Sequence, residues 1–395
     1  MNLIIDSIMG GGKTTWAINH MNRSQQRRFI FATPFLNEDI RIKNSCPTLH
    51  FVEPNGTFSK MSDLKKIISQ GKNVATTHAL LSQWIPTAAD IDNLRKWNYT
   101  LILDEALEVI RPVQNLNADD LRVLRAGLLE VDAATNKVTW IAENCPQRYL
   151  DIKKLADAGR LFICRDSQLL DLMPIDVLKS TPNIIVMTFL FEASHLCYYM
   201  RMHGMRWRKA FITNGRIQMG EADLTPKKQE IKRLLSIYSG KYNHCGEKRN
   251  ALSASFWTSA RHAVERRQVI RNIRSFFLTY CRSSVDHCMW STFKDKPGSE
   301  TNVVKGFKTA FVPFNAKATN EFGDRTCLAY AVNVYENPMI FAWFCDHGLT
   351  LDCEVFALSA MLQWIWRSAI RNGRAVKLYL PSLRMREILC AWLES

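Results

Sequence analysis

The sequence predicts an α/β fold in which one chain forms two domains with parallel sheets. Three observations lead to this prediction: a length of 395 residues, an apolar fraction of 47%, and short apolar runs that alternate with helical segments. Because this chain is longer than a domain with a single hydrophobic core usually is, we expect two domains, residues 1–195 and 196–395. The apolar fraction also excludes a mainly disordered chain.

The composition favours a polyanionic partner. Lys and Arg number 52 against 37 Asp and Glu, which gives a formal charge of +15. No apolar run reaches the roughly 18 residues of a membrane span, and Asp6 and Lys13 interrupt the stretch where a signal peptide would be apolar. The eleven cysteines form no CxxC pair, so buried free thiols are favoured over a zinc site or disulfides. We expect a cytoplasmic protein without membrane contact.

The segment SIMGGGKTTW, residues 7–16, has the pattern of a phosphate-binding loop. An apolar run precedes it and a helix-prone run follows it, which is the context that such a loop requires. Ser7 stands where the motif has its first glycine, and a small residue can make that turn without touching phosphate. The alternative is a glycine-rich turn with an incidental lysine.

A working loop of this kind would bind ATP and Mg²⁺. Successive backbone amides and a helix N-terminus would hold the phosphates, Lys13 would reach the β- and γ-phosphates, and the Thr14 hydroxyl would bind Mg²⁺. The predicted nucleotide-binding residues are Gly10, Gly11, Gly12, Lys13, Thr14 and Thr15.

The second half of the predicted site is the acidic pair in YTLILDEALEVI, residues 99–110. Leu101–Leu103 is typical of a buried strand, and Asp104 and Glu105 follow at its carboxyl end, where parallel sheets bind ligands. We expect Asp104 to hold Mg²⁺ and Glu105 to act as the base that activates water. The alternative is a helix cap, since Asp and Glu both suit a helix start.

Two further strand–turn–helix units, residues 27–42 and 71–84, surround the predicted site. Their strands end in short polar groups that would gather at the same sheet edge as the phosphate-binding loop. These groups are candidates for contact with a nucleic-acid backbone: Thr33, Pro34, Thr77 and His78.

The order of these four segments resembles superfamily 2 helicases of the DEAD/DEAH-like kind, in the compact form that phages encode. The resemblance implies two RecA-like domains of a helicase core, ATP-driven translocation and a location in the host cytoplasm. Residues 184–199 resemble the third motif of that superfamily, in which Thr188 would couple the nucleotide to the domain interface. Residues 305–333, expected to form a strand, a polar loop and a helix, resemble the fifth motif, with Asn315 and Thr319 as nucleic-acid contacts.

ALSAMLQWIWRSAIRNG, residues 357–373, resembles the sixth motif. Gln363, Arg367 and Arg371 recur at a spacing of four, so on a helix they would share one face. The resemblance gives them a catalytic role, in which an arginine neutralises charge on the γ-phosphate. Trp366 replaces the glycine of the motif, and the second arginine comes one residue late. The alternative is an exposed basic helix face.

Two basic segments complete the second half. Residues 215–253 are polar and turn-rich, and we expect an insertion that is either a phosphate contact or a solvated surface. Residues 261–282 predict an amphipathic helix whose apolar face includes Val264, Ile270, Ile273 and Phe277.

The predicted function is an ATP-dependent nucleic-acid helicase or single-strand translocase in phage replication or recombination. The expected partners are single-stranded DNA, with RNA as the alternative, and proteins of replication or recombination; a monomer is expected. Two alternatives stay open. One is a phage DNA-packaging motor, which also pairs a glycine loop with an Asp-Glu box. The other is a nucleic-acid-binding protein that ATP switches without unwinding.

Overall fold

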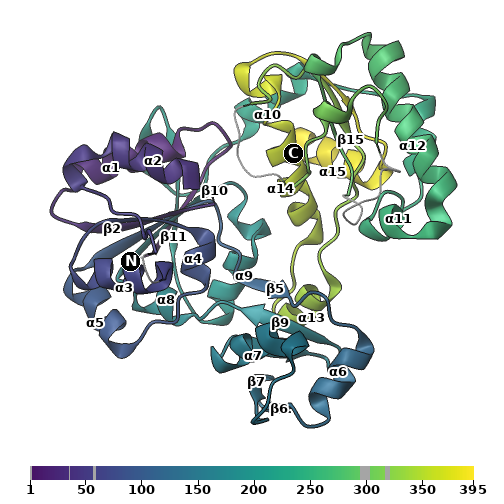
Figure 1. Ribbon diagram of the computed structural model, residues 1–395. Coiled ribbons are helices and arrows are strands. Elements are labelled where there is room, and N and C mark those ends of the chain that lie inside the picture. The colour runs from purple at the N-terminus through teal and green to yellow at the C-terminus, as the bar shows by residue number, and fades with distance from the viewer. Residues whose placement is uncertain (1, 35, 57–58, 294–302, 316–320) are drawn as a thin grey trace. The chain divides into compact units, whose positions relative to one another are not determined.

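The computed structural model describes residues 2–34, 36–56, 59–293, 303–315 and 321–395. The chain forms two compact units (Figure 1). Unit 1 contains the chain up to Ala222 together with Asn337–Leu351, and unit 2 contains Asp223–Glu336 and Asp352–Ser395. The predicted α/β class, with a parallel sheet in each half of the chain, is confirmed.

Unit 1 is built on a seven-stranded sheet with the order β12-β11-β1-β10-β4-β2-β3. All neighbouring strands are parallel except β11 and β12. The strands are β1 (Asn2–Asp6), β2 (Arg28–Thr33), β3 (Val74–Thr77), β4 (Tyr99–Asp104), β10 (Asn183–Thr188), β11 (Arg208–Thr213) and β12 (Arg216–Met219). Since β1, β10 and β4 are adjacent, the segments that follow them meet at one edge of the sheet.

Helices cover both faces of this sheet (Figure 1). Alternate strand residues enter different cores: Ile5 and Ile102 pack with α1 and α2, whereas Ile4 and Leu101 pack on the other side. The first face carries α1 (Lys13–Arg23) and α2 (Leu36–Ser45). The second face carries α3 (Lys60–Ser69), α4 (His78–Ser82), α5 (Ala88–Lys96), α8 (Asp176–Ser180) and α9 (His195–Met202).

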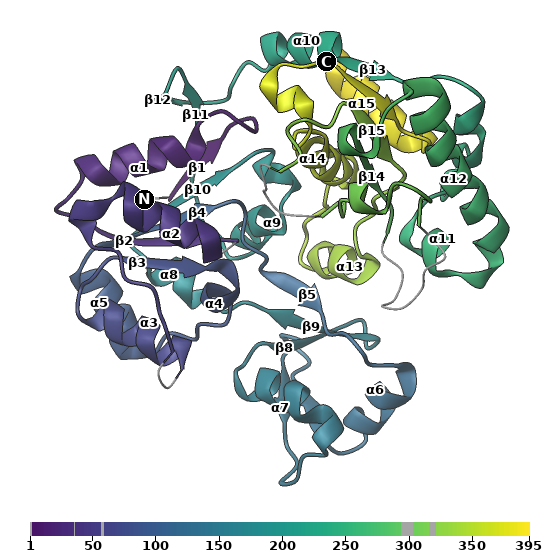
Figure 2. The same cartoon turned by 45° about the horizontal axis from the view of Figure 1, so that its top comes forward.

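The chain between β4 and β10 forms a small α/β subdomain outside the seven-stranded sheet (Figure 2). It contains β5 (Ile110–Pro112), α6 (Ala118–Arg125), β6 (Leu129–Val131), β7 (Val138–Trp140), α7 (Leu150–Asp157), β8 (Leu161–Cys164) and β9 (Gln168–Leu172). The distant helix α13 (Pro338–Asp346) joins it: Arg165 donates two hydrogen bonds to the Asp346 carboxylate, at 3.0 and 2.7 Å. No local sequence pattern predicts this return of the chain to unit 1.

Unit 2 contains a four-stranded parallel sheet with the order β13-β16-β15-β14. Its strands are β13 (Leu235–Ile237), β14 (Cys288–Ser291), β15 (Cys327–Tyr330) and β16 (Val376–Tyr379). Its helices are α10 (Thr225–Leu234), α11 (Ala254–Thr258), α12 (Ala263–Ser275), α14 (Cys353–Ile365) and α15 (Leu383–Glu394). Residues of α11 and α12 pack with one face of the sheet, where Phe276, Trp290 and Tyr379 belong to one core.

The structure corrects the predicted domain boundary at 195/196. Unit 1 continues to Ala222 because β11 pairs with β1 and β12 pairs with β11. The expected insertion at 215–253 is therefore wrong: β12 extends the sheet of unit 1, while α10 and β13 begin unit 2.

Two predictions about local structure in unit 2 also differ from the structure. The helix expected within 305–333 is replaced by β15, whose register with β14 and β16 pairs Cys327 with Cys288 and Lys377. Val264 does not belong to a buried face, since its side chain is 64% exposed, whereas Ile273 and Phe277 are buried. None of the helices in the described residues is both long and apolar enough for a membrane span.

Candidate nucleotide-binding site

The predicted phosphate-binding loop joins β1 to α1, and its conformation depends on its glycines. Gly10 and Gly12 have φ of 76° and 79°, the left-handed region that glycine adopts without strain. At Gly11 a Cβ atom would lie 3.0 Å from the Ile8 carbonyl oxygen, so a larger residue would strain the turn. The helix begins at Lys13 with Gly12 as its N-cap and no side-chain cap. Its first amides are thus oriented for an anion.

The Lys13 side chain folds back over the loop. Its ammonium donates to the carbonyl oxygens of Ser7, at 2.7 Å, and Ile8, at 3.3 Å. Burial lowers the pKa of Lys13, while the nearby Glu105 and Asp104 carboxylates act in the opposite direction. These contacts hold a cation beside the amides of the loop.

Thr14 and Asp104 come together although 90 residues separate them. The Thr14 hydroxyl donates to a carboxylate oxygen of Asp104 at 3.2 Å. Burial, and secondarily the adjacent Glu105 carboxylate, raises the pKa of Asp104 to about 7. A hydroxyl and a carboxylate are both ligands that suit Mg²⁺. The predicted metal-binding pair is therefore adjacent in the structure.

Glu105 is held in an uncommon backbone conformation beside this pair. Its φ is 72°, and its amide donates to the Met187 carbonyl oxygen at 2.9 Å. The Thr188 hydroxyl donates to the Glu105 carboxylate at 3.4 Å. Thr188, singled out from the sequence as a coupling residue, thus contacts the predicted base.

Ser7 has a structural partner that the sequence did not reveal. Its hydroxyl accepts a hydrogen bond from the Ile212 amide at 2.8 Å, and its own amide donates to the Thr188 carbonyl oxygen at 3.0 Å. The serine therefore joins the start of the loop to β11 on one side and to the end of β10 on the other.

Asp6 is a site residue that sequence reasoning missed. Its carboxylate accepts hydrogen bonds from the Leu190 and Phe191 amides, at 2.8 and 2.9 Å. Burial raises the pKa of Asp6 despite these bonds. The sequence did contain a signal for Asp6, because this residue, like Asp104, stands at the end of an apolar strand. The Asp6 carboxylate fixes the turn that follows Thr188.

The residues predicted to contact nucleic acid from unit 1 are largely enclosed. Thr33 is 0% exposed and His78 is 6% exposed, with Nε2 of His78 3.2 Å from the Ala32 carbonyl oxygen. Thr77 caps α4 by accepting from the Leu80 amide at 3.3 Å, and Pro34 is half-buried. Thr33 and His78 are thus packed into the sheet edge in this structure, and their contact with a nucleic-acid backbone stays a prediction.

The predicted C-terminal residues do not share one helix face. Helix α14 ends at Ile365 with Trp366 as its C-cap, so only Gln363 lies on it. Gln363 donates to the Ser359 hydroxyl at 3.1 Å. Arg367 lies in the turn after α14, and Arg371 lies in the short 3₁₀ helix Ala369–Asn372. Asn315 is exposed, and Thr319 lies outside the described residues.

Comparison with known proteins places the chain in a family. The chain is 33% identical to the SPbeta prophage-derived uncharacterized protein YonV of Bacillus subtilis (strain 168), over 99% of this chain and 98% of that protein. The chain belongs to the YonV family. Residues 229–393 match the model of the YonV C-terminal Rossmann-like domain, which agrees with the parallel sheet of unit 2.

Among solved structures, the YonV-family chain is similar to two XPD structures, one of the apo form and one of XPD helicase, and to S. tokodaii Xpd4. The TM-scores are 0.47, 0.44 and 0.45, with 12%, 14% and 14% identity, over 99% of this chain and 95%, 95% and 94% of those chains. Scores this low carry no conclusion about function.

Proposed function

We propose that this protein is an ATP-dependent nucleic-acid helicase or single-strand translocase that acts on DNA. The contact between Thr14 and Asp104, at 3.2 Å, carries the proposal. It joins a glycine loop and an acidic strand end, the two parts that ATP hydrolysis with Mg²⁺ requires. A glycine-rich turn without a nucleotide would have no need of this pairing.

ATP and Mg²⁺ fit the residues present. The amides of Gly10 and Gly12 would hold the phosphates together with Lys13, and Thr15 would follow in the first turn of α1. The Gly11 amide donates to the Ile8 carbonyl oxygen at 3.1 Å and would exchange that bond for one to a phosphate oxygen. Thr14 and Asp104 would hold Mg²⁺, which supplies charge neutralisation at the phosphates. Glu105, held by Thr188, would accept a proton from the attacking water.

The nucleic-acid partner is proposed from charge. A formal charge of +15 attracts phosphate backbones, and such binding weakens with salt. The prophage origin of YonV supports a role in phage replication or recombination, in the host cytoplasm. We propose that Gln363, Arg367 and Arg371 complete catalysis, on the strength of their likeness to the sixth helicase motif, and that the protein acts as a monomer.

An ATPase assay tests this function. The intact protein should hydrolyse ATP with Mg²⁺, and single-stranded DNA should stimulate turnover more than duplex DNA or RNA, less so at high salt. Lys13→Ala should abolish turnover, whereas Lys72→Ala, at an exposed position in the same unit, should not. Absent or unstimulated turnover would rule out a motor. Stimulated turnover without strand displacement or movement would favour the ATP-switched binding protein.

A further inference from the structure

A cavity of about 610 Å³ lies in unit 2, between the turn Lys241–Gly246 and α12. We infer that it binds a nucleobase together with an adjoining phosphate. If the base belongs to a nucleic-acid strand, the inference rests on the proposed function, and the cavity is then a nucleic-acid contact of unit 2. The residues that carry the inference are Lys241, Lys248, Phe256, His262, Gln268 and Asn272.

Aromatic rings form part of the cavity wall. The rings of Phe256 and His262 are stacked, with centroids 5.0 Å apart and an interplanar angle of 24°. Phe256 is 6% exposed, so its ring position is set by the core, and His262 is half-buried. A flat π surface of this kind favours a planar ligand, and every nucleobase has such a face.

Two amide side chains lie on the same wall, one helical turn apart. Gln268 donates to the Asn272 side-chain oxygen at 2.8 Å and accepts from Arg271, also at 2.8 Å. These contacts use one of the two amide protons of Gln268. An oriented amide with a remaining donor can pair with the edge of a base.

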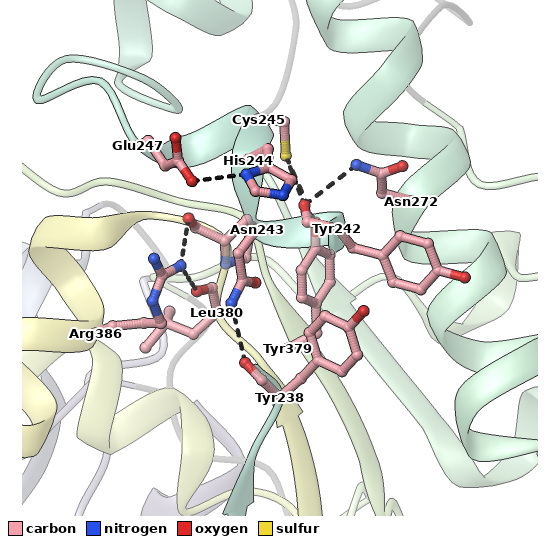
Figure 3. Close-up of polar contacts among 11 residues, drawn as sticks. Tyr238, Tyr242, Asn243, His244, Cys245, Glu247, Asn272, Tyr379, Leu380 and Arg386 are labelled. Atoms are coloured by element: carbon pink, nitrogen blue, oxygen red, sulfur yellow. Dashed lines mark hydrogen bonds and ion pairs between the residues drawn. The ribbon is translucent and has the colours of Figure 1, made fainter. Parts of the chain in front are cut away.

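The wall is fixed from behind by a network around Tyr242 (Figure 3). The Tyr242 carbonyl oxygen accepts from Asn272 at 3.2 Å, from the Cys245 thiol at 3.2 Å and from the Tyr379 hydroxyl at 2.6 Å. These donors come from α12, the turn itself and β16. The cavity is therefore preformed, which lowers the entropic cost of binding.

Charge identifies the second part of the ligand. Lys241 and Lys248 line the cavity and are exposed, so their ammonium groups are available to a phosphate. Glu265 is the acid on the same wall, and its carboxylate lies 3.9 Å from Nδ1 of His262. Because the two lysines outnumber Glu265, we expect the part of the ligand at the rim of the cavity to carry negative charge.

The size of the cavity selects a single unstacked nucleotide. Small-molecule sites span roughly 300–1,000 Å³, and a duplex cannot enter a space of that size. A base that has left the stack fits, and its flanking phosphates would meet the lysines. A free mononucleotide has the same chemistry, so the experiment must separate the two sources.

Equilibrium binding with the full-length protein tests the inference. The probes are a labelled dT oligonucleotide, an abasic oligonucleotide of equal length, and dTMP as competitor. Gln268→Leu should weaken binding of the dT strand about tenfold and leave the abasic strand unchanged, because only the base meets the amide. Lys248→Glu should weaken both strands, since both carry phosphate.

Matched controls are Gln229→Leu and Lys232→Glu on the exposed side of α10, which should change binding less than their counterparts. Thermal unfolding of each variant separates misfolding from lost contact, and Phe256→Leu tests the aromatic wall independently. Equal affinity for the dT and abasic strands, or equal effects of Gln268→Leu and Gln229→Leu, overturns the base site.

The two sources and the two proposals give different results. If dTMP competes with the dT strand and this competition is lost in Gln268→Leu, the ligand of the cavity is a free nucleotide. If the protein binds the dT strand better than the abasic strand and dTMP does not compete, the ligand is an unstacked base within a strand. Base-dependent binding without ATP turnover refutes the motor and keeps the cavity site. Strand-stimulated turnover with base-independent binding refutes the cavity site and keeps the motor.

Discussion

Glu105 illustrates how single residues set the candidate site. Its left-handed backbone, the hydrogen bond from its amide to the Met187 carbonyl oxygen and its contact with Thr188 direct the carboxylate beside Asp104. Backbone conformations this uncommon persist where the surroundings impose them, and they cluster at functional sites. The sequence predicted the residue and its role, but not this conformation.

Replacing Glu105 by Gln tests its role as a base. Gln keeps the size and a hydrogen-bond acceptor but cannot take a proton at neutral pH, so ATP turnover should fall at least about 100-fold. ATP binding, measured by equilibrium titration, should change little. Glu108→Gln, at a nearby exposed position, is the control. Unchanged turnover would assign the base to another group.

Asp39 gives a pH-dependent prediction. Burial, and secondarily the Glu53 carboxylate, raises its pKa from 3.8 to about 7, and neither of its carboxylate oxygens has a hydrogen-bond partner among the described residues. Between these values the folded protein binds more protons than the unfolded chain, so this group lowers stability as pH rises from about 4 to about 7. Asp39→Asn removes that loss.

Thermal unfolding of Asp39→Asn and the parent at a series of pH values measures this effect. The variant should be the more stable protein at pH 8, and the difference should disappear below about pH 3, where Asp39 is largely protonated in both states. Asp92→Asn on the same unit is the control. A stability difference that does not vary with pH would show that Asp39 is not the titrating group.

At the scale of elements, a buried ion pair holds the subdomain together. Asp171 on β9 accepts from Arg160 at 2.9 Å and from Arg111 of β5 at 2.9 Å, and the Asp171 and Arg160 side chains are 3% and 7% exposed. Removing one member of a buried pair leaves the other charge without compensation.

Asp171→Asn should therefore destabilise the protein by ~3 kcal/mol, measured as a fall in the free energy of unfolding by chemical denaturation. Asp157→Asn, whose partner Lys153 lies on the surface of α7, should cost well under half of this amount. Equal costs for the two variants would show that the buried pair adds nothing beyond a surface pair.

Elements with a clear local pattern were predicted, and those set by long-range contacts were not. The sequence indicated β1, β2, β3 and β4, because each carries a compact apolar run followed by a turn. It did not indicate that α14 stops at Ile365, since the residues that follow have no helix-breaking pattern. The sequence did not predict the subdomain between β4 and β10, because the strands of that subdomain are short.

At the scale of the whole molecule, the proposed motor requires both units. We expect Arg367→Ala to reduce ATP turnover at least about 1,000-fold while leaving ATP binding nearly intact, because an arginine that neutralises the γ-phosphate acts in the transition state. Arg374→Ala, which breaks an exposed pair with Asp324, is the control. Loss of ATP binding in Arg367→Ala, or turnover that survives the substitution, would refute the proposed role of Arg367 in neutralising the γ-phosphate.

The sequence by itself determined the α/β class, the glycine loop, the Asp-Glu strand end and the basic charge, because each is a local pattern of residues. The tertiary structure alone decided that Thr14 meets Asp104, that Ser7 bonds to β11 and that Asn337–Leu351 returns to unit 1. It also enclosed Thr33 and His78 and formed the cavity beside α12. These features depend on contacts between segments far apart in the chain, which local patterns do not specify.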